Sequence, residues 1–360
     1  MKILLLGEFS GLHNNLRDGL LTLGHQVQLA AGTDGFKNFP NDIALEIPGK
    51  NLKTRIYNYV TPFLRIYRLI NYDVMQTINP FFPNGRFFPL KTFYCPLLFF
   101  NKKSFLVAAG SDAFFWKNSK AIMRYGPFED FKKYDARKAS MVGRKYYMET
   151  ESAYEYNAWL SNGVNGIIPV MWEYKVGYKN HIKLRDPIPL PINLEKIPEP
   201  KFDYRRKLNV FHGVTRYGFK GTRHIEKAFN KLEKSYPGRF NLIISPRSSY
   251  SEYLRILEDA DILIDQVNSY SPGMNALIGL AMGKVVLSGN ESEAGAIFGA
   301  SKSPILNVTP NHQSIVDTVI NVDSDRKKFD ELRREGREYI RRYHNHIDIA
   351  AKYVSAWSAE

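Results

Sequence analysis

The sequence predicts an α/β protein built from two doubly wound domains, each with a parallel sheet covered by helices on both faces. Short apolar runs alternate with amphipathic, helix-like segments along both halves of the chain, as in parallel sheets with helical crossovers. The stretch 182–200 holds five prolines, which exclude a helix interior and suggest a crossover between domains. The length of 360 residues also exceeds what one core usually holds.

The first half opens with a strand, a turn and a helix. Residues 3–6 are apolar enough for a buried strand, and residues 7–11 contain two glycines that form the turn. Leucines then recur at helical spacing over 12–23, and a second strand follows Gly24, which makes a βαβ opening. Further strands are expected at 73–78, 104–109 and 166–170.

The second half repeats the alternation more regularly. We expect strands at 209–213, 241–245, 261–265, 284–288 and 304–307, and helices at 222–234, 250–259, 274–282 and 312–320, before a charged helical region at 326–358. The predicted domains are 1–195 and 196–335, with a C-terminal helix, 336–360, that returns to the first domain. Because ligands of such folds bind at the carboxyl ends of the strands, we expect these edges to face each other across a cleft.

The composition is globular and strongly basic, with 44% hydrophobic residues and a formal net charge of +14. This charge favours nucleic acid, an anionic membrane surface or phosphorylated ligands as partners. No zinc-finger, RNP or basic-zipper pattern occurs, so we expect no nucleic-acid partner.

No apolar run approaches the roughly 18–20 residues of a membrane span, and the apolar start is too short for a signal peptide, so we expect a cytoplasmic protein. The single cysteine, Cys95, stands among apolar residues and is expected to be an inert core thiol.

The loop after the strand at 209–213 carries two cations, Arg216 and Lys220. An amphipathic helix begins after Gly221, so the loop lies at the carboxyl edge of a sheet and beside the amino end of a helix. Free backbone N–H groups, the helix dipole and both cations suit a diphosphate ligand. The alternative is an ordinary loop with solvated basic residues.

An ordered series of motifs resembles the glycosyltransferases of the GT-B fold, which has two Rossmann-like domains. The series spans nearly the whole chain and consists of GEFSGLHNNLRDGLLTLGHQV at 7–27, FLVAAGSD at 105–112, IPLPIN at 188–193, RYGFKG at 216–221, ADILIDQ at 260–266 and SPGMNALIGLAMGKVVLSG at 271–289. It is most similar to the retaining, nucleotide-sugar-dependent families of bacterial polysaccharide synthesis. Ala109 replaces the histidine of the second motif.

The resemblance implies transfer of a sugar from a nucleotide-diphosphate donor to a glycan or lipid-linked acceptor in cell-surface polysaccharide synthesis. Arg216 and Lys220 would meet the negative charge that builds on the β-phosphate. The donor site would comprise these two cations and Gly11, Gly213, Tyr270, Gly273, Met274, Asn275, Glu291 and Glu293. The N–H groups of Met274 and Asn275 would add to the cations. No Asp-x-Asp motif occurs, so we expect no metal site and no cofactor other than the nucleotide-sugar co-substrate.

The chain departs from the family at two glutamates that are commonly eight positions apart around the glycine loop. They would fall at Tyr270 and Ile278, and isoleucine cannot hold the ribose hydroxyls. Donor contacts could shift to Asn275, Glu291 or Glu293. The departure also keeps open a second hypothesis, a non-catalytic relative that binds nucleotide sugars or glycans.

Two first-domain residues are candidates for catalysis. His13 follows the first loop, where imidazole could act as a base or bind the sugar; in inverting relatives of this fold, a histidine in a similar loop deprotonates the acceptor. The alternative is a helix-start histidine bonded to a backbone carbonyl. Asp112 could orient His13 or bind the acceptor, or it could cap the following helix.

Two segments of the first domain combine basic and aromatic residues without any acid. They are 50–70 and 84–103, and exposed cations of this kind could bind an anionic lipid surface. The protein would then be peripheral on the inner face of the cytoplasmic membrane. The alternative is that the aromatic residues face the core and the cations are solvated.

Overall fold

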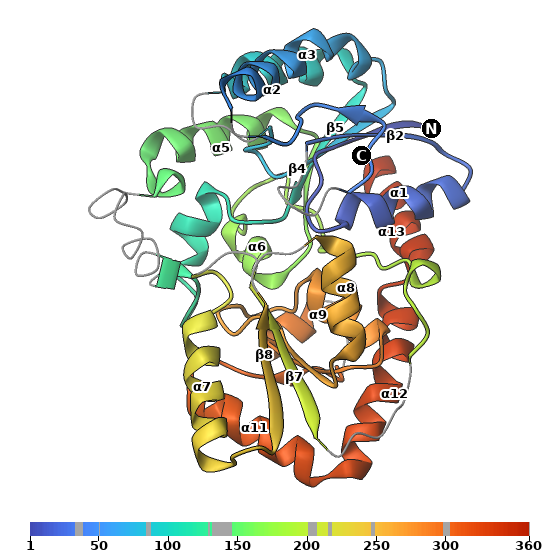
Figure 1. Ribbon diagram of the computed structural model, residues 1–360. Coiled ribbons are helices and arrows are strands. Elements are labelled where there is room, and N and C mark those ends of the chain that lie inside the picture. Colours follow the sequence, from blue (N-terminus) through green and yellow to red (C-terminus); the bar gives the residue numbers. More distant parts are fainter. Residues whose placement is uncertain are drawn as a thin grey trace. The chain divides into compact units, whose positions relative to one another are not determined.

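The computed structural model describes residues 1–32, 39–49, 51–83, 88–128, 130–131, 146–200, 207–214, 218–245, 249–297 and 303–359. These residues form two compact units (Figure 1). The first comprises Met1–Ile122, Lys145–Asn193 and His346–Glu360, and the second comprises Met123–Arg144 and Leu194–Asn345. The segment that begins at Met123 thus belongs to the second unit, whereas the sequence placed it in the first domain.

The first unit is built on a six-stranded parallel sheet. Its strand order is β3-β2-β1-β4-β5-β6, and every pairing between neighbours is parallel. The strands are β1 Lys2–Leu6, β2 Gln26–Ala31, β3 Ile43–Ala44, β4 Val74–Ile78, β5 Lys103–Ala108 and β6 Gly166–Pro169. The order reverses direction beside β1, so the carboxyl ends of β1 and β4 form the switch point at which such sheets bind ligands.

Helices cover both faces of this sheet. They are α1 Leu12–Thr22, α2 Leu52–Leu64, α3 Leu90–Phe100, α5 Glu151–Gly163, α6 Trp172–Gly177 and α13 His346–Ser358, with short turns η1 Ile66–Arg68, η2 Phe115–Ser119 and η3 Tyr147–Glu149. Alternate side chains of each strand point to opposite faces. Leu4 and Leu6 of β1 therefore join the core formed with α3 and α5, whereas Phe105 of β5 meets Trp357 of α13.

The second unit repeats the plan with a five-stranded parallel sheet of order β11-β10-β9-β7-β8. Its strands are β7 Leu208–Gly213, β8 Phe240–Ser245, β9 Ile262–Ile264, β10 Val285–Ser288 and β11 Leu306–Asn307. Its helices are α7 Thr222–Ser235, α8 Tyr250–Asp259, α9 Met274–Ala281, α10 Ser292–Ala296, α11 His312–Ser324 and α12 Arg326–Tyr343, with the turn η4 Leu194–Lys196. Apolar side chains of α7 and α11 pack with alternate residues of β7, β9 and β10.

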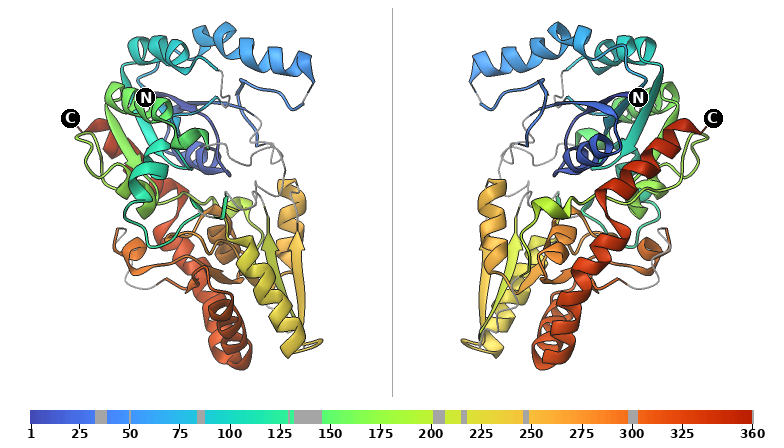
Figure 2. Two further views of the ribbon diagram at one scale, coloured as in Figure 1. Left: turned by 90° about the vertical axis from the view of Figure 1, so that its left-hand side faces the viewer. Right: turned by 90° about the vertical axis from the view of Figure 1, so that its right-hand side faces the viewer.

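The C-terminal region consists of two helices rather than one continuous helix. Helix α12 ends at Tyr343 and belongs to the second unit, and α13 begins at His346 and belongs to the first. Helices α13 and α1 lie side by side in both figures (Figures 1 and 2). Their approach requires Gly19, because a Cβ atom there would lie 2.2 Å from the carbonyl oxygen of His346.

The expected strands all exist, with ends that differ by at most two residues. The two-residue strand β3 and the short helix α10 were not anticipated, because neither has a long apolar run. The first-unit helices α2, α3, α5 and α6 were not predicted individually either. The interpretation of Cys95 as a core thiol is wrong, since the residue is exposed. It stands on α3, where helical periodicity buries Phe93, Tyr94 and Leu97 and turns Cys95 outward. No helix among the described residues is long and apolar enough to cross a bilayer.

Candidate functional site

Most of the expected donor-binding residues belong to the second unit and lie at the carboxyl edge of its sheet. Strands β7 and β9 are neighbours there, and the loops that follow them lead into α7 and towards α9. Lys220 stands in the first of these loops. Arg216, the other expected cation, lies outside the described residues.

The ammonium group of Lys220 is buried and paired with a carboxylate. Its Nζ donates to Oδ1 of Asp265 at 2.7 Å and to the carbonyl oxygen of Gly213 at 3.2 Å. The side chains are 10% and 2% exposed. Desolvation makes such a pair hard to break, since removal of one partner typically costs about 3–5 kcal/mol. The pair therefore holds the lysine at the ends of β7 and β9.

A tight turn sets the position of Lys220. Gly221 has φ 76°, and a Cβ atom there would lie 2.3 Å from Cγ2 of Val267. The carbonyl oxygen of Lys220 accepts a hydrogen bond from the N–H of Val267 at 2.9 Å. Glycine tolerates this backbone conformation and this close approach, so the loop that enters α7 is anchored to the loop that follows β9.

His212 reinforces this edge as a neutral group. One ring nitrogen, Nδ1, lies 2.8 Å from the carbonyl oxygen of Ile264, and the other, Nε2, lies 3.0 Å from Oγ1 of Thr222. Burial, followed by the positive charge of Lys220, lowers the pKa of His212 to about 4. The ring thus ties the end of β7 to β9 and to the start of α7.

Helix α9 begins at the same edge. Its N-cap residue, Gly273, has an extended backbone, and Oδ2 of Asp265 lies 3.6 Å from the position that a Gly273 Cβ atom would take. Met274 and Asn275 form the first turn. Every residue of α9 is buried, including Ile278 at 3% exposure, so isoleucine at this position packs inside the unit.

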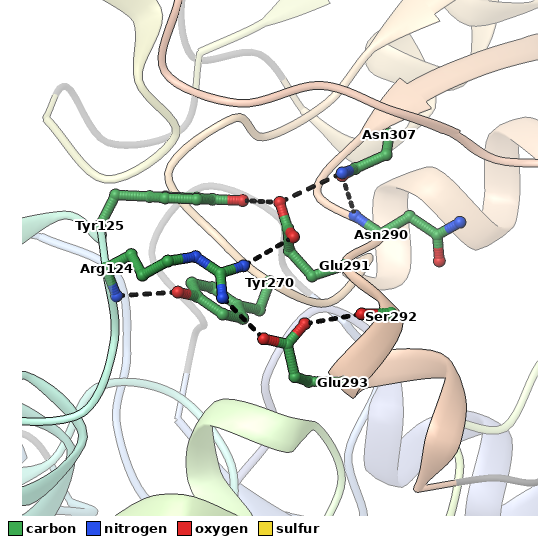
Figure 3. Close-up of polar contacts among 8 residues, drawn as sticks. All are labelled: Arg124, Tyr125, Tyr270, Asn290, Glu291, Ser292, Glu293 and Asn307. Atoms are coloured by element: carbon green, nitrogen blue, oxygen red, sulfur yellow. Dashed lines mark hydrogen bonds and ion pairs between the residues drawn. The ribbon is translucent and has the colours of Figure 1, made fainter.

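Tyr270 is the centre of a second cluster of polar groups (Figure 3). Its hydroxyl oxygen accepts a hydrogen bond from the backbone N–H of Arg124 at 2.8 Å. The guanidinium carbon of Arg124 lies 5.0 Å from the centre of the tyrosine ring. The same guanidinium bonds Glu291 through Nη2 and Glu293 through Nη1, both at 2.8 Å. One arginine thus joins the aromatic ring and both expected glutamates.

Glu291 has two further partners within this cluster. The hydroxyl of Tyr125 donates to Oε1 of Glu291 at 2.5 Å, and Nδ2 of Asn307 donates to the same oxygen at 3.1 Å. The rings of Tyr125 and Tyr270 are 4.9 Å apart. Hydrogen bonds, first from its own backbone N–H, lower the pKa of Glu293. The hydrogen bonds of Arg124, Tyr125 and Asn307 hold the two glutamate side chains in a fixed geometry.

No pattern in the sequence marks Arg124 and Tyr125 as site residues. They precede Tyr270 by 146 and 145 positions in the sequence, as 270 − 124 and 270 − 125, and no local pattern relates them to it. Arg124 and Tyr125 reach the site because the segment that begins at Met123 packs within the second unit. Asp130 extends the same segment: it accepts a hydrogen bond from Nδ2 of Asn268 at 2.9 Å, and its Oδ1 lies 2.5 Å from Nε of Arg223.

His13 belongs to the first unit and is fully buried. Its Nδ1 lies 2.6 Å from the carbonyl oxygen of Gly7, and its Nε2 lies 3.2 Å from Nε2 of Gln76, whose Oε1 accepts from Trp357. Burial lowers the pKa of His13 to about 4. Both ring nitrogens of His13 thus have polar partners inside the first unit. The contact with the carbonyl oxygen of Gly7 is the one expected under the alternative that His13 has a structural role.

Asp112 is also buried in the first unit and caps a helical turn. Its Oδ1 accepts from the N–H of Phe115 at 2.8 Å, and its Oδ2 accepts from the hydroxyl of Tyr178 at 2.7 Å. Burial raises the pKa of Asp112 to about 6. The hydrogen bond to Phe115 is the capping interaction expected as the alternative to acceptor binding.

The first loop of this unit already contains an anion. Glu8 accepts hydrogen bonds from the N–H of Gly11 at 2.7 Å and from the N–H of Asn14 at 2.8 Å, and it is 4% exposed. The N–H group of Gly11, expected to contact the donor, is thus bonded to a carboxylate. Unlike Lys220 and the Tyr270 cluster, the expected residues Gly11, His13 and Asp112 belong to the first unit.

A scan against protein-family models found no match, and a search of the curated proteins found none either. Solved structures do match. Sucrose-phosphate synthase from Thermosynechococcus elongatus superimposes with a TM-score of 0.63 at 14% sequence identity, over 99% of this chain and 98% of that one. Anabaena HepE in complex with UDP and glucose gives a TM-score of 0.62 at 12% identity, over 100% of both chains.

The chain has the GT-B fold. The predicted architecture of two doubly wound α/β domains is therefore confirmed. UDP-GlcNAc 2-epimerase from Neisseria meningitidis is also similar, with a TM-score of 0.53 at 11% identity over 99% of both chains. The GT-B fold thus occurs in proteins with different activities, so the fold alone does not specify the activity of this chain.

Proposed function

We propose that this chain is a glycosyltransferase that moves a sugar from a nucleotide-diphosphate donor to a glycan or lipid-linked acceptor. The observation that carries the proposal is the buried ammonium group of Lys220, bonded to Asp265 and Gly213 at the carboxyl ends of β7 and β9. A cation at this edge of a doubly wound sheet suits a diphosphate, because the ligands of such sheets bind there.

The cation has a direct role in the proposed reaction. When the glycosidic bond of the donor breaks, negative charge develops on the β-phosphate that leaves. Lys220 would meet this charge, together with Arg216 and the N–H groups of Met274 and Asn275 at the start of α9. A preorganised donor of this kind is worth about 10²–10³ in turnover. Because cations and N–H groups would stabilise the leaving phosphate, the proposed reaction needs no fixed metal ion. The absence of a metal requirement stays a prediction.

The Tyr270 cluster would recognise the hydroxyl groups of the donor. Glu291 and Glu293 offer carboxyl oxygens, which accept hydrogen bonds from hydroxyls. Arg124 pairs with both at 2.8 Å, which orients them and offsets their charge beside an anionic ligand. This cluster would substitute for the carboxylate that Ile278 cannot supply.

HepE was solved with UDP and glucose, which supports uridine nucleotides as the first donors to examine. The proposal extends to cell-surface polysaccharide synthesis in the cytoplasm, where the acceptor would be a glycan or lipid-linked molecule. It includes Gly213 and Gly273 as residues that border the diphosphate.

A substitution of both members of the ion pair tests the proposal. Lys220→Met with Asp265→Leu removes the cation without leaving a buried charge unpaired. We expect normal thermal unfolding without ligand, loss of the stabilisation by UDP, and a turnover of UDP-sugars lower by about 10²–10³. For the wild type, UDP at 100 times its Kd should stabilise by about 2.7 kcal/mol.

Lys227→Met is the matched control, since Lys227 stands on α7 but is exposed. It should keep both the UDP response and turnover. A double variant that transfers sugar at the wild-type rate would contradict the proposal. UDP binding without any donor hydrolysis or transfer in the wild type would instead favour a non-catalytic nucleotide-sugar-binding relative, the function suggested by Ile278 in place of a glutamate.

A further inference from the structure

Large apolar side chains are exposed on one face of the first unit. Of the fourteen large apolar residues that are exposed among the described residues, eight belong to α2, η1 and the end of α3. They are Leu52, Ile56, Tyr59, Val60, Leu64, Tyr67, Phe99 and Phe100. We call the surface that they form the α2–α3 face. Such a concentration marks an interaction site, whereas single exposed apolar residues do not.

Helix α2 is oriented with its apolar stripe outward. Leu52, Ile56, Val60 and Leu64 follow one another at four-residue spacing, which places them along one side of a helix. Their exposed fractions are 71%, 56%, 41% and 69%. The side of α2 that faces the unit buries Thr54, Thr61 and Pro62 instead. Large apolar side chains that stay in water forgo the favourable free energy of burial, so this orientation suggests a partner.

Buried and half-buried rings connect α2 to α3 beneath their exposed residues. Phe63 of α2 stacks on Phe88 with ring centres 5.2 Å apart, and Phe88 contacts Phe93 of α3 at 5.6 Å. At the other end, the N–H of Asn71 donates to the carbonyl oxygen of Phe100 at 3.1 Å. The ring of Phe63 also contacts that of Phe93 directly, with centres 6.0 Å apart.

The charge of the α2–α3 face has one sign. Lys53, Arg55 and Arg68 are exposed on α2 and η1. Residues 51–72 and 88–111 include no aspartate or glutamate. The face therefore combines large apolar groups with cations, which is the chemistry that inserts into the headgroup region of an anionic bilayer.

We infer that the α2–α3 face binds the surface of an anionic lipid bilayer. The apolar side chains would enter the boundary between headgroups and acyl chains, and the cations would contact lipid phosphates. Each cation near such a surface adds to the electrostatic attraction. A second copy of the chain fits less well, because a two-fold interface brings the same patch against itself and would set Lys53, Arg55 and Arg68 against like charges.

Vesicle flotation tests this inference independently of any transferase activity. The full chain is mixed with vesicles of phosphatidylcholine alone or of equal parts phosphatidylcholine and phosphatidylglycerol. The wild type should float with the anionic vesicles only, and less so at high salt. Leu52→Ser, Ile56→Ser and Leu64→Ser together should reduce the bound fraction at least tenfold. Lys53→Gln, Arg55→Gln and Arg68→Gln together should reduce it by a similar factor and weaken the salt dependence.

Leu21→Ser is the matched control, because Leu21 is 46% exposed but stands on α1. It should bind anionic vesicles as the wild type does. All variants should share the wild-type thermal unfolding, since only exposed side chains change. A wild type that ignores anionic vesicles overturns the inference, and so does an equal loss in the Leu21 variant. A dimer that Ile56→Ser converts to monomers, with no vesicle binding, would assign the face to self-association.

Discussion

The two units share a strand-loop-helix opening but differ in the charge that this opening holds. In the first unit, Glu8 accepts hydrogen bonds from the N–H groups of Gly11 and Asn14 at the start of α1. In the second, the loop before α7 holds the ammonium of Lys220, and no side chain among the described residues caps the helix start at Gly221. A carboxylate already bonded to a helix amino end competes with an anionic ligand. The difference supports our proposal that the second unit, rather than the first, binds the donor diphosphate.

The histidines of the two openings show what the units have in common. His13 connects the loop after β1 to Gln76 on the neighbouring strand β4. His212 connects the end of β7 to Ile264 on its neighbour β9. Burial lowers both pKa values to about 4. A neutral buried histidine is therefore a common structural device, and the charge beside it is what distinguishes the units.

The largest expected effect concerns the ion pair of the second unit. Lys220→Met alone leaves Asp265 as a buried, unpaired carboxylate and should lower the free energy of unfolding by about 3–5 kcal/mol. Adding Asp265→Leu should restore most of this loss, because two apolar groups can replace a buried pair at little cost. Urea unfolding of both variants measures the difference. If the single and double variants are equally unstable, the ion pair does not hold this opening together.

A smaller effect than the loss of the ion pair is expected in the pH dependence of stability, which should differ between the two units. Each histidine is neutral in the folded state, with a pKa below that of the unfolded chain. The stability that each histidine contributes is fully present above pH 6.5, the pKa of an unfolded histidine. It is lost as the pH falls towards 4, the pKa in the folded state. The loss approaches about 3 kcal/mol per histidine. In the first unit, Asp112 acts in the opposite direction, because its raised pKa of about 6 makes stability fall as the pH rises through that value.

Variants separate these contributions. His212→Gln should flatten the acid limb of the stability profile between pH 6.5 and 4. Asp112→Asn should steepen it, because the opposing carboxyl group is gone. Chemical unfolding at a series of pH values measures both slopes. A His212 variant that keeps the wild-type slope would show that the imidazole is protonated without cost in the folded protein.

The smallest effect should come from the anion of the first unit. Glu8→Ala removes the acceptor at the start of α1 and should cost about 0.5–2 kcal/mol, as the loss of a helix cap does. It should leave the affinity for UDP unchanged, since the proposed phosphate site is in the second unit. Thermal unfolding and UDP titration of one preparation check both statements. A gain in UDP affinity would show instead that Glu8 excludes the diphosphate from the first loop.

Local patterns were sufficient to predict every strand except the two-residue β3, and also the first helix and, apart from α10, the helices of the second half. The runs at 73–78 and 209–213 are short, apolar and followed by turns, and each became a buried parallel strand, β4 and β7. Lys220 was found for the same reason, because its place in a loop between a strand and a helix is a local property. Its partner Asp265 was not, since the pairing depends on which strands are neighbours.

By itself, the sequence determined the α/β alternation, the two-domain plan and the position of Lys220 at the edge of a sheet. These depend on side-chain periodicity and turn residues within a few positions of each other. Tertiary structure alone decided that His13 would be buried against Gly7 and Gln76, that Arg124 would meet Glu291 and Glu293, and that the apolar stripe of α2 would face outward. The physical reason is that pairing and burial depend on strand order and packing, which bring together residues that are remote in the chain.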